Sequence, residues 1–292
     1  MDPGISFALI GALIWGVYLF ALKQYFADIP ATVLVVYANS FALLWYAPML
    51  GRSLGVGGTL EALSVLGGLQ IAVLIVTSVL VAGAILTLLL ALAAGDVSYV
   101  APISKIVPVF VLPIEVLVLG QLLGPLQVAG VVVATVAVYV ANYHGGSLVE
   151  PIRRAATSRA AQLALLSAML FAVSDVTKRI GLQELAIPSV LWVPLLLGGV
   201  LDVVLPVAVR DHPSTIRPAL PKLAVLGGVL AAGEYVTTLA FALVPASIAS
   251  PIINTQAIIA VLLGGILLGE QYFRTRLLAA LLAVVGVTMI AL

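Results

Sequence analysis

Ionisable side chains inside long apolar stretches are the residues of this chain most suited to chemistry. Lys105, Asp175 and Glu234 lie deep within such stretches. A charged side chain at the centre of a membrane-spanning helix costs about 2.5–3.5 kcal/mol on insertion scales, so each one requires a partner or a function. A buried lysine can hold a carboxylate or a phosphate, and a buried glutamate can carry a proton. These three side chains therefore mark the candidate binding and coupling positions.

Lys105 belongs to a motif that the chain contains twice. It follows Pro102 by three residues. Its counterpart 149 positions later (254 − 105) is Asn254, which follows Pro251 at the same spacing. Each proline removes one hydrogen bond of a helix, which predicts two kinked helices with polar side chains at equivalent depths, so both prolines have structural roles. We expect Lys105 to hold a substrate carboxylate or phosphate, with hydrogen bonds from Asn254 and Gln256.

Each charge also has a purely structural explanation. Lys105 could form an ion pair with Glu234 or Glu115, and Glu234 would then be a partner and not a proton carrier. Asp175 lies three residues before Lys178, the spacing of an ion pair on one helix face, so a structural role is favoured there. Asp175 stays among the cavity candidates because of the apolar stretch that it occupies. The residues alone leave both interpretations of Lys105 and Glu234 open.

Aromatic and amide side chains complete the predicted binding site. Trp15 and Tyr18 in the first apolar stretch could stack on an aromatic or apolar substrate. Tyr37 and Asn39 are polar residues in the middle of the second stretch, and Tyr235 lies in the eighth. The predicted substrate-binding set is Trp15, Tyr18, Tyr37, Asn39, Lys105, Asp175, Glu234, Tyr235, Asn254 and Gln256, and Glu270 is predicted to cap a turn or a helix start.

The composition places the chain in a lipid bilayer. Of 292 residues, 63% are hydrophobic and 9% are charged, against about 25% charged residues in soluble domains. The formal net charge of +1 leaves no basic field for nucleic acid. The chain has no cysteine, and its two histidines fall in predicted loops, so neither a metal site nor a catalytic cluster is expected. We expect a multi-pass protein of the cell membrane without a cofactor or enzymatic activity.

Helices that cross the bilayer must position these side chains. About 20 apolar residues span the hydrocarbon core as a helix, and we count ten stretches of this size. The one long polar connection, residues 144–159, separates the first five from the last five. Glycine-rich segments such as 51–58 are predicted as turns between spans. The predicted spans are 5–25, 30–50, 65–93, 97–119, 125–143, 160–179, 187–209, 220–243, 247–268 and 273–292.

The second half of the chain repeats the first. At an offset of 149 positions (251 − 102), Leu90, Ala91 and Pro102 meet identical residues, which indicates a duplicated segment. Because each copy holds five spans, an odd number, the second copy enters the membrane upside down. The sequence thus predicts an all-helical membrane protein made of two inverted five-helix repeats, over 1–143 and 160–292, joined by the polar connection. Inverted repeats can open a central cavity to each side in turn, which favours a carrier over a pore.

Short motifs recur in a fixed order along the whole chain. They are Trp15-Gly16 with Lys23, Ala-Pro-Ile at 101–103, Leu-Leu-Gly-Glu at 267–270, and Gly286-Val287. In their order and spacing the chain resembles the EamA family of the drug/metabolite transporter superfamily. The resemblance implies a ten-helix carrier, often an exporter of amino acids, small metabolites or drugs, with a cavity lined by spans 1, 3, 4, 6, 8 and 9. The first copy departs from the family, with Gln121 where an acid is expected.

We therefore expect a secondary transporter that moves small metabolites by alternating access through a cavity between the repeats. Amino acids or related compounds are the expected substrates, and export is the expected direction. One alternative is a carrier of nucleotide sugars, or of phosphorylated or lipid-linked metabolites, with the same fold. A second alternative, with less support in the residues, is an integral membrane enzyme.

The expected partners follow from this function. They are the small-molecule substrate, the lipid bilayer and, for a coupled carrier, protons, with no nucleic acid. The protein is expected as a monomer or a homodimer. The count of positive charges in the loops places both termini outside the cell, whereas the family resemblance places them in the cytoplasm.

Overall fold

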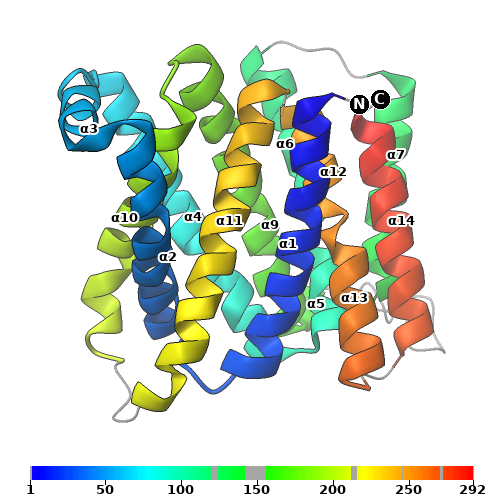
Figure 1. Ribbon diagram of the computed structural model, residues 1–292. Helices are drawn as coiled ribbons and strands as arrows, with labels where there is room; N and C mark the ends of the chain where they lie inside the picture. Colours follow the sequence, from blue (N-terminus) through cyan, green and yellow to red (C-terminus); the bar gives the residue numbers. More distant parts are fainter. Residues whose placement is uncertain are drawn as a thin grey trace.

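Helices form every regular element of the computed structural model in the residues that it describes (Figure 1). Seven helical segments among these residues are long and apolar enough to cross a bilayer. An all-helical, multi-pass membrane architecture is therefore confirmed, while the number of ten spans stays a prediction. The structure describes residues 2–119, 124–141, 156–211, 216–244, 246–269 and 272–291.

The helices follow one another in two series that agree closely with the predicted stretches. The first series is α1 (Pro3–Phe26), α2 (Ala31–Ser53), α3 (Gly55–Ser64), α4 (Gly68–Ala94), α5 (Val97–Ser104), α6 (Val107–Leu119) and α7 (Pro125–Ala141). The second is α9 (Arg159–Arg179), the π-helical turn η1 (Ile180–Glu184), α10 (Ser189–Ala208), the 3₁₀ turn η2 (Arg217–Ala219), α11 (Leu220–Leu243), α12 (Ala246–Asn254), α13 (Gln256–Leu267) and α14 (Phe273–Ala291). We refer to the two series as the first and second halves.

Side chains at the starts of α1 and α9 explain why each helix begins there. The N–H of Gly4 donates to Asp2 Oδ1 over 2.7 Å. The N–H of Ala161 donates to Ser158 Oγ over 3.4 Å. Such caps satisfy backbone donors that have no partner within the first turn of a helix. The equivalent first helices of the two halves are thus started by the same device.

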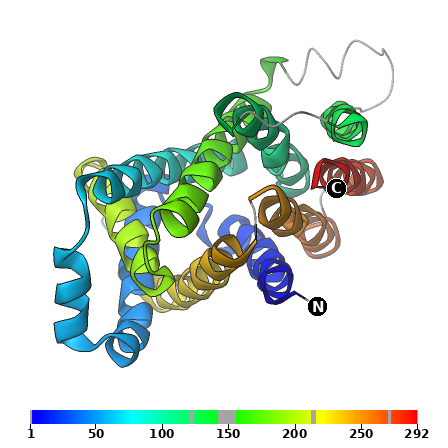
Figure 2. The same cartoon turned by 90° about the horizontal axis from the view of Figure 1, so that it is seen from above.

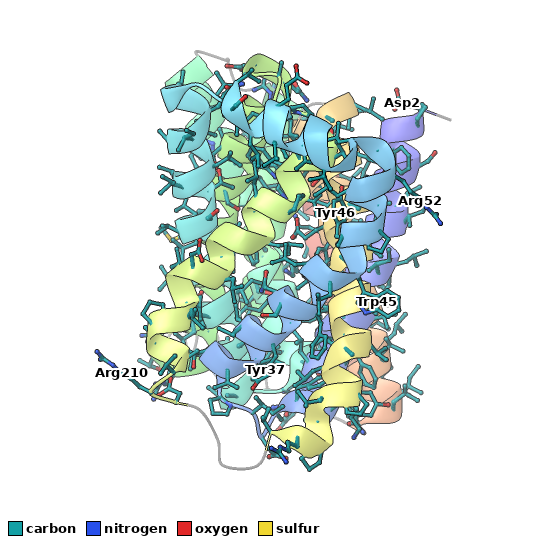
Figure 3. All side chains as sticks on the ribbon, turned by 60° about the vertical axis from the view of Figure 1, so that its left-hand side comes forward. Asp2, Tyr37, Trp45, Tyr46, Arg52 and Arg210 are labelled. Carbon is teal, nitrogen blue, oxygen red and sulfur yellow. The ribbon has the colours of Figure 1, made fainter. Side chains whose placement is uncertain are left out.

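The segment 51–58, predicted as a turn, is helical over most of its length, and this prediction is wrong. α2 continues to Ser53, and α3 begins at Gly55. The chain changes direction at Gly55, whose φ of +67° is a conformation that glycine adopts without strain. α3 has no buried residue and lies across one end of the bundle (Figures 1 and 3).

The fourth and ninth predicted spans are each broken into two helices. The break between α5 and α6 falls at Lys105 and Ile106, and the break between α12 and α13 falls at Thr255. Pro108 has no N–H to bond to the carbonyl group of Ser104, which prevents a continuous helix at the first break. The predicted kinks are therefore found as interruptions, at equivalent positions of the two halves.

The helices of the second half run opposite to their counterparts in the first half. α1 and α4 end together, because Lys23 Nζ donates to the carbonyl oxygen of Gly95 over 3.0 Å. α9 begins at that same end, where Ala160 lies beside Gly95, so α9 is antiparallel to α1. Thr32 at the start of α2 donates to Asp211 just after α10, over 2.8 Å, so α10 is antiparallel to α2. Figure 1 shows the same reversal between α4 and α11.

The interior of the molecule is a seam between the two halves. α1 packs on α11 and α13, α2 packs on α10 and α11, and α4 packs on α9. Each of these contacts joins a helix of the first half to a helix of the second. α7 and α14 lie side by side at one edge of the bundle, and α3 lies at the opposite edge (Figure 2). Side chains that face inward from the central helices therefore meet at this seam.

Candidate functional site

A cavity lies at the seam between the two halves. Its lining comes from α1, α2, α4 and the α5–α6 break on one side, and from α9 to α13 on the other. The space open to the centre of a water molecule is about 110 Å³. A space of this size suits a small metabolite.

Eight of the ten side chains predicted to bind substrate line this cavity. They come from both halves of the chain, although more than 200 positions separate the first from the last. The fold therefore brings together residues that only the repeat and the apolar stretches connect in the sequence. They are Trp15, Tyr18, Asn39, Lys105, Asp175, Glu234, Asn254 and Gln256.

Tyr37 and Tyr235 are not among the described residues that line the cavity, so their predicted role in binding stays a prediction. With about 100° of rotation per residue, Tyr37 is turned about 160° away from Asn39 on α2. Tyr37 lies near the start of α2 (Figure 3). Tyr235 is turned about 100° away from Glu234 on α11. Its ring packs against that of Tyr46, with 6.1 Å between the ring centres.

The prolines with predicted structural roles are buried inside short helices. Pro102 lies within α5 and Pro251 within α12, and neither lines the cavity. Each precedes a helix break by a few residues, where the chain brings Lys105 or Asn254 to the cavity. Glu270 lies outside the described residues, as does the side chain of Glu115.

Lys105 occupies the break between α5 and α6, and only 7% of it is exposed. Its Nζ lies 5.0 Å from the centre of the Phe171 ring on α9, an attractive cation–π contact. Within the part of the chain that the structure describes, no hydrogen bond or ion pair reaches this ammonium group. A buried ammonium group without an ionic partner is costly, so Lys105 has the capacity to bind an anion.

Glu234 forms its ion pair with Lys178 of α9, and the predicted alternative of a pair with Lys105 is wrong. Lys178 Nζ lies 3.2 Å from Glu234 Oε2, and the two side chains are 6% and 11% exposed. Lys178 reaches across to α11 in place of pairing with Asp175 on its own helix. A pair on one helix surface is weak, whereas a buried carboxylate on the neighbouring helix strongly requires a partner.

Asp175 is held by a hydrogen-bonded chain from α12. Ser250 Oγ donates to Asp175 Oδ2 over 2.7 Å. Asn254 Nδ2 donates to the backbone oxygen of Ser250 over 2.7 Å and to its Oγ over 3.2 Å. Asn254 thus acts on the site partly through Ser250, which fixes the side chain of Asp175.

An aromatic pair lies beside these charges on α1. The indole N–H of Trp15 donates to Thr237 Oγ1 of α11 over 2.8 Å. The rings of Trp15 and Tyr18 meet edge to face, with 5.3 Å between their centres. The hydrogen bond fixes the indole ring at the seam, where it can serve as a rigid apolar surface.

The two halves present equivalent positions to the cavity but different chemistry. Between α1 and α9, equivalent positions lie 156 residues apart (171 − 15). Between the helices α4 to α6 and the helices α11 to α13, they lie 149 residues apart (234 − 85). We call the α1 and α4 side the apolar wall, and the α9 and α11 side the polar wall. The pairs are Trp15/Phe171, Tyr18/Ser174, Leu19/Asp175, Leu22/Lys178, Ile85/Glu234, Leu88/Thr237, Lys105/Asn254 and Val107/Gln256.

Several lining residues are missed by reasoning from the sequence. Phe171, Ser174 and Lys178 lie on the same face of α9 as Asp175. The signal that could find them is the repeat itself, because Trp15 and Phe171 occupy equivalent positions. Extending that pairing along one helix face marks each of these residues in turn.

The sequence model of the EamA-like transporter family matches residues 2–143 and 158–292. The chain belongs to the EamA-like transporter family. The match falls on both halves, so this EamA-family chain contains two EamA repeats and is a membrane transporter of the drug/metabolite type. A comparison with curated proteins gives no match.

The fold of this EamA-family chain also occurs among solved structures. One of them, described as "Crystal structure of protein", is similar over 98% of this chain and 95% of its own, with a TM-score of 0.69. The two sequences are 14% identical, so the likeness concerns the fold.

Proposed function

We propose that this EamA-family transporter is a secondary carrier of small zwitterionic metabolites, with amino acids as the first candidates. The observation that carries the proposal is the buried cavity at the seam, which contains both Lys105 and Asp175. The proposal includes ten spans arranged as two inverted five-helix repeats, a location in the cell membrane, and export as the net direction. Alternating access through the cavity is the proposed mechanism.

The charges of the cavity fit a substrate that carries both signs. Lys178 and Glu234 neutralise each other through their ion pair. Lys105 has no ionic partner among the described residues, and Asp175 uses only Oδ2 in its hydrogen bond to Ser250. A substrate carboxylate would bind Lys105, and a substrate ammonium group would bind Asp175.

The apolar wall fits the remainder of such a substrate. Leu19, Leu22 and Ile85 face the cavity at positions whose counterparts are Asp175, Lys178 and Glu234. Trp15 and Tyr18 add aromatic surface on the same wall. An aliphatic or aromatic side chain of a few carbon atoms would bury its surface there. Amino acids with apolar side chains therefore match the cavity better than polar ones.

The same charges weigh against the alternative of a nucleotide-sugar or phosphorylated substrate. Two cations, Lys105 and Lys178, and two anions, Asp175 and Glu234, line the cavity. A phosphate group with two negative charges would meet no net positive charge there. The zwitterion is the better electrostatic match.

Helix breaks at the cavity support alternating access. The breaks between α5 and α6 and between α12 and α13 include the equivalent positions Ile106 and Thr255 (255 − 106 = 149). Discontinuous helices at the binding site, in repeats that run in opposite directions, are a common architecture of secondary carriers. Each half could then adopt the conformation of the other, which would move the opening from one side to the other.

The test is transport by the purified protein in proteoliposomes. We expect saturable uptake of amino acids with apolar side chains, weaker uptake of doubly charged amino acids, and no uptake of nucleotide sugars. Assays with and without an imposed pH gradient test whether protons are coupled to the substrate.

Three outcomes would contradict the proposal. Non-saturable flux would indicate a channel. Chemical conversion of the compound would indicate an enzyme. Uptake restricted to phosphorylated compounds would favour the alternative carrier.

A further inference from the structure

Side chains bind helix carbonyl groups at both ends of the central cavity. At the first end, Lys23 Nζ donates to the carbonyl oxygens of Leu92 over 2.6 Å and of Gly95 over 3.0 Å. Leu22 and Leu89, which precede these groups by one turn or less, line the cavity. Lys23 thus ties the end of α1 to the end of α4 just beyond the cavity.

Arg276 of α14 joins the two halves at this same end. Its Nη1 donates to Asp96 Oδ2 over 2.9 Å and to Ser98 Oγ over 2.7 Å. The guanidinium group lies 5.6 Å from the centre of the Tyr99 ring. Arg276 is only 6% exposed, which protects its bond to Ser98, whereas the side chain of Asp96 is 47% exposed and is partly screened by water and salt. The bonds cross the seam, since Asp96 and Ser98 belong to the first half and Arg276 to the second.

The charged groups of this end lie outside the central cavity. Asp96, Tyr99 and Arg276 line a second hollow at this end of the molecule. Among the described residues, no side chain lines both this hollow and the central cavity.

At the opposite end, the counterpart of Lys23 is Arg179 (179 − 23 = 156), but an uncharged amide binds the equivalent carbonyl groups. Gln183 Nε2 donates to the carbonyl oxygens of Phe241 over 2.7 Å and of Val244 over 3.0 Å. These acceptors lie 149 positions after Leu92 and Gly95 (241 − 92 and 244 − 95). The same two carbonyl groups of each half are thus bound by an ammonium group at one end and by an amide at the other.

The ion pair across the seam has no counterpart in the residue types of the other half. The residue 149 positions after Asp96 is Pro245, and the residue 149 positions before Arg276 is Gln127 (245 − 96 and 276 − 127). Neither a proline nor a glutamine carries a charge. Both ends therefore share the same fold, but only the first end carries the charges of Asp96 and Arg276.

Charged residues near the second end bind each other locally. Arg179 Nη2 lies 3.8 Å from Glu184 Oε1, within the continuous segment of α9 and η1. The carboxylate side chain is 49% exposed, about as much as that of Asp96, and exposed pairs contribute about 0–1 kcal/mol. This pair joins no second helix, in contrast to the bonds of Arg276.

We propose that Lys23, Asp96 and Arg276 form a charged latch that keeps their end of the carrier closed, so that the end bound by Gln183 opens more readily. The proposal rests on the carrier function proposed above. Charge-assisted hydrogen bonds are roughly twice as strong as neutral ones, so opening the latched end costs more free energy. Two identical ends would open with similar ease. The latch makes the population of the conformation open at its own end smaller than that of the conformation open at the other end.

Access to the cavity tests the latch directly, because the chain contains no cysteine. The variant Val81→Cys places a thiol in the cavity lining. A membrane-impermeant maleimide is applied to either face of sealed vesicles that contain the protein. Arg52→Cys and Arg210→Cys, at opposite ends of the bundle, identify the two faces (Figure 3).

We expect Val81→Cys to be labelled mainly from the face that labels Arg52→Cys. Adding Asp96→Asn with Arg276→Gln should raise labelling from the Arg210 face about tenfold. This factor corresponds to the free energy of one charge-assisted bond. Adding Lys23→Gln, which copies the amide of the other end, should give a smaller rise from the same face.

Two variants serve as matched controls. The charge reversal Asp96→Arg with Arg276→Asp keeps an ion pair and should keep the latched end closed. Gln183→Lys places a charged donor at the other end and should lower labelling from the Arg52 face. Lys23→Gln carries the test alone if the double variant does not fold.

The outcomes separate the latch from the carrier function. An unchanged labelling ratio in Lys23→Gln and in the folded double variant would overturn the latch. Preferential labelling of Val81→Cys from the Arg210 face in the parent chain would do the same. A cavity cysteine that reacts from neither face in any variant would contradict the carrier function itself, whereas saturable transport with an unshifted ratio would contradict only the latch.

Discussion

Individual charges in the cavity fall into two kinds, those with an ionic partner and those without one. Lys178 and Glu234 form a buried pair between α9 and α11. Lys105 contacts the Phe171 ring, and Asp175 accepts a hydrogen bond from Ser250. A solute can compete for the second kind more easily than for the first, because it does not have to break an ion pair. The roles of these side chains can therefore be separated by substitution.

Lys105→Ala is expected to weaken substrate binding without loss of folded protein. A hydrogen bond to a charged group contributes about 1.5–3 kcal/mol, so the apparent affinity should fall roughly 10- to 100-fold. Concentration-dependent uptake into proteoliposomes measures the change. Lys222→Ala is the matched control, because this lysine is exposed, lies outside the cavity lining and places its Nζ 5.6 Å from the centre of the Tyr25 ring. Equal affinity of the two variants would remove Lys105 from the site.

Glu234→Gln is expected to destabilise the protein by about 3–5 kcal/mol, because it leaves the buried ammonium group of Lys178 without its partner. Thermal unfolding in detergent measures the loss. The double variant Lys178→Met with Glu234→Leu removes both charges and should recover most of the stability. Failure of the double variant to recover would show that the pair has a role beyond neutralising itself.

The same double variant tests the candidate coupling role of Glu234. It has no ionisable group at these positions, so a carrier that uses Glu234 for protons should lose its response to a pH gradient. Uptake with and without the gradient, in the variant and in the parent chain, gives the comparison. A retained response would exclude Glu234 as the coupling residue.

Sequence reasoning found most polar residues of the cavity but not their pairing. Lys105, Asp175 and Glu234 could be predicted because a charge in an apolar stretch is rare. The partner of Glu234 could not be predicted, because Lys178 lies at the end of a predicted span and has Asp175 as a nearer acid on its own helix. Pairing depends on which helices become neighbours, and that information lies outside the local pattern.

At the scale of the elements, helices of the two halves pack closely where one of them has a glycine. Gly227 of α11 lies against the backbone of α2, where an added Cβ would come within 2.8 Å of Ala42 N. Trp45 fixes the same crossing, because its indole N–H donates to the carbonyl oxygen of Ala224 over 2.9 Å. Gly198 of α10, by contrast, has no atom within 4 Å of the position of an added Cβ.

Gly227→Ala should therefore lower stability while Gly198→Ala should not. Both changes raise helix propensity by about 1 kcal/mol, which makes them a matched pair. At Gly227 the clash with backbone atoms should outweigh this gain by about 1–3 kcal/mol. Thermal unfolding of the two variants in one detergent gives the difference. An equally stable pair would mean that α2 and α11 pack less closely than described.

Predicted spans agree with the helices because about 20 apolar residues define a membrane helix by length alone. The break after α5 had a signal in Pro108, but Thr255 has no proline after it to mark the second break. α3 was missed because its glycine content favours a turn over a helix, and the exposed helix buries no residue that could reveal a pattern.

At the scale of the whole molecule, the start of α1 and the end of α14 lie at the same end of the bundle (Figure 1). Ten spans, an even number, would also place both termini on one side of the membrane. We expect reporters fused to the two termini to give the same answer, which a pair of topology reporters in cells can check. Termini on opposite sides would contradict the proposed count of ten.

The unequal walls of the cavity have a stereochemical consequence. A cation, an anion and an apolar surface give three different points of attachment, and three points suffice to tell a molecule from its mirror image. A solute bound in this way would also keep one orientation during transport, because its carboxylate stays with Lys105 and its ammonium group with Asp175 whichever side of the cavity is open. Duplication followed by divergence of one copy would thus have turned a symmetric frame into a chiral receptor.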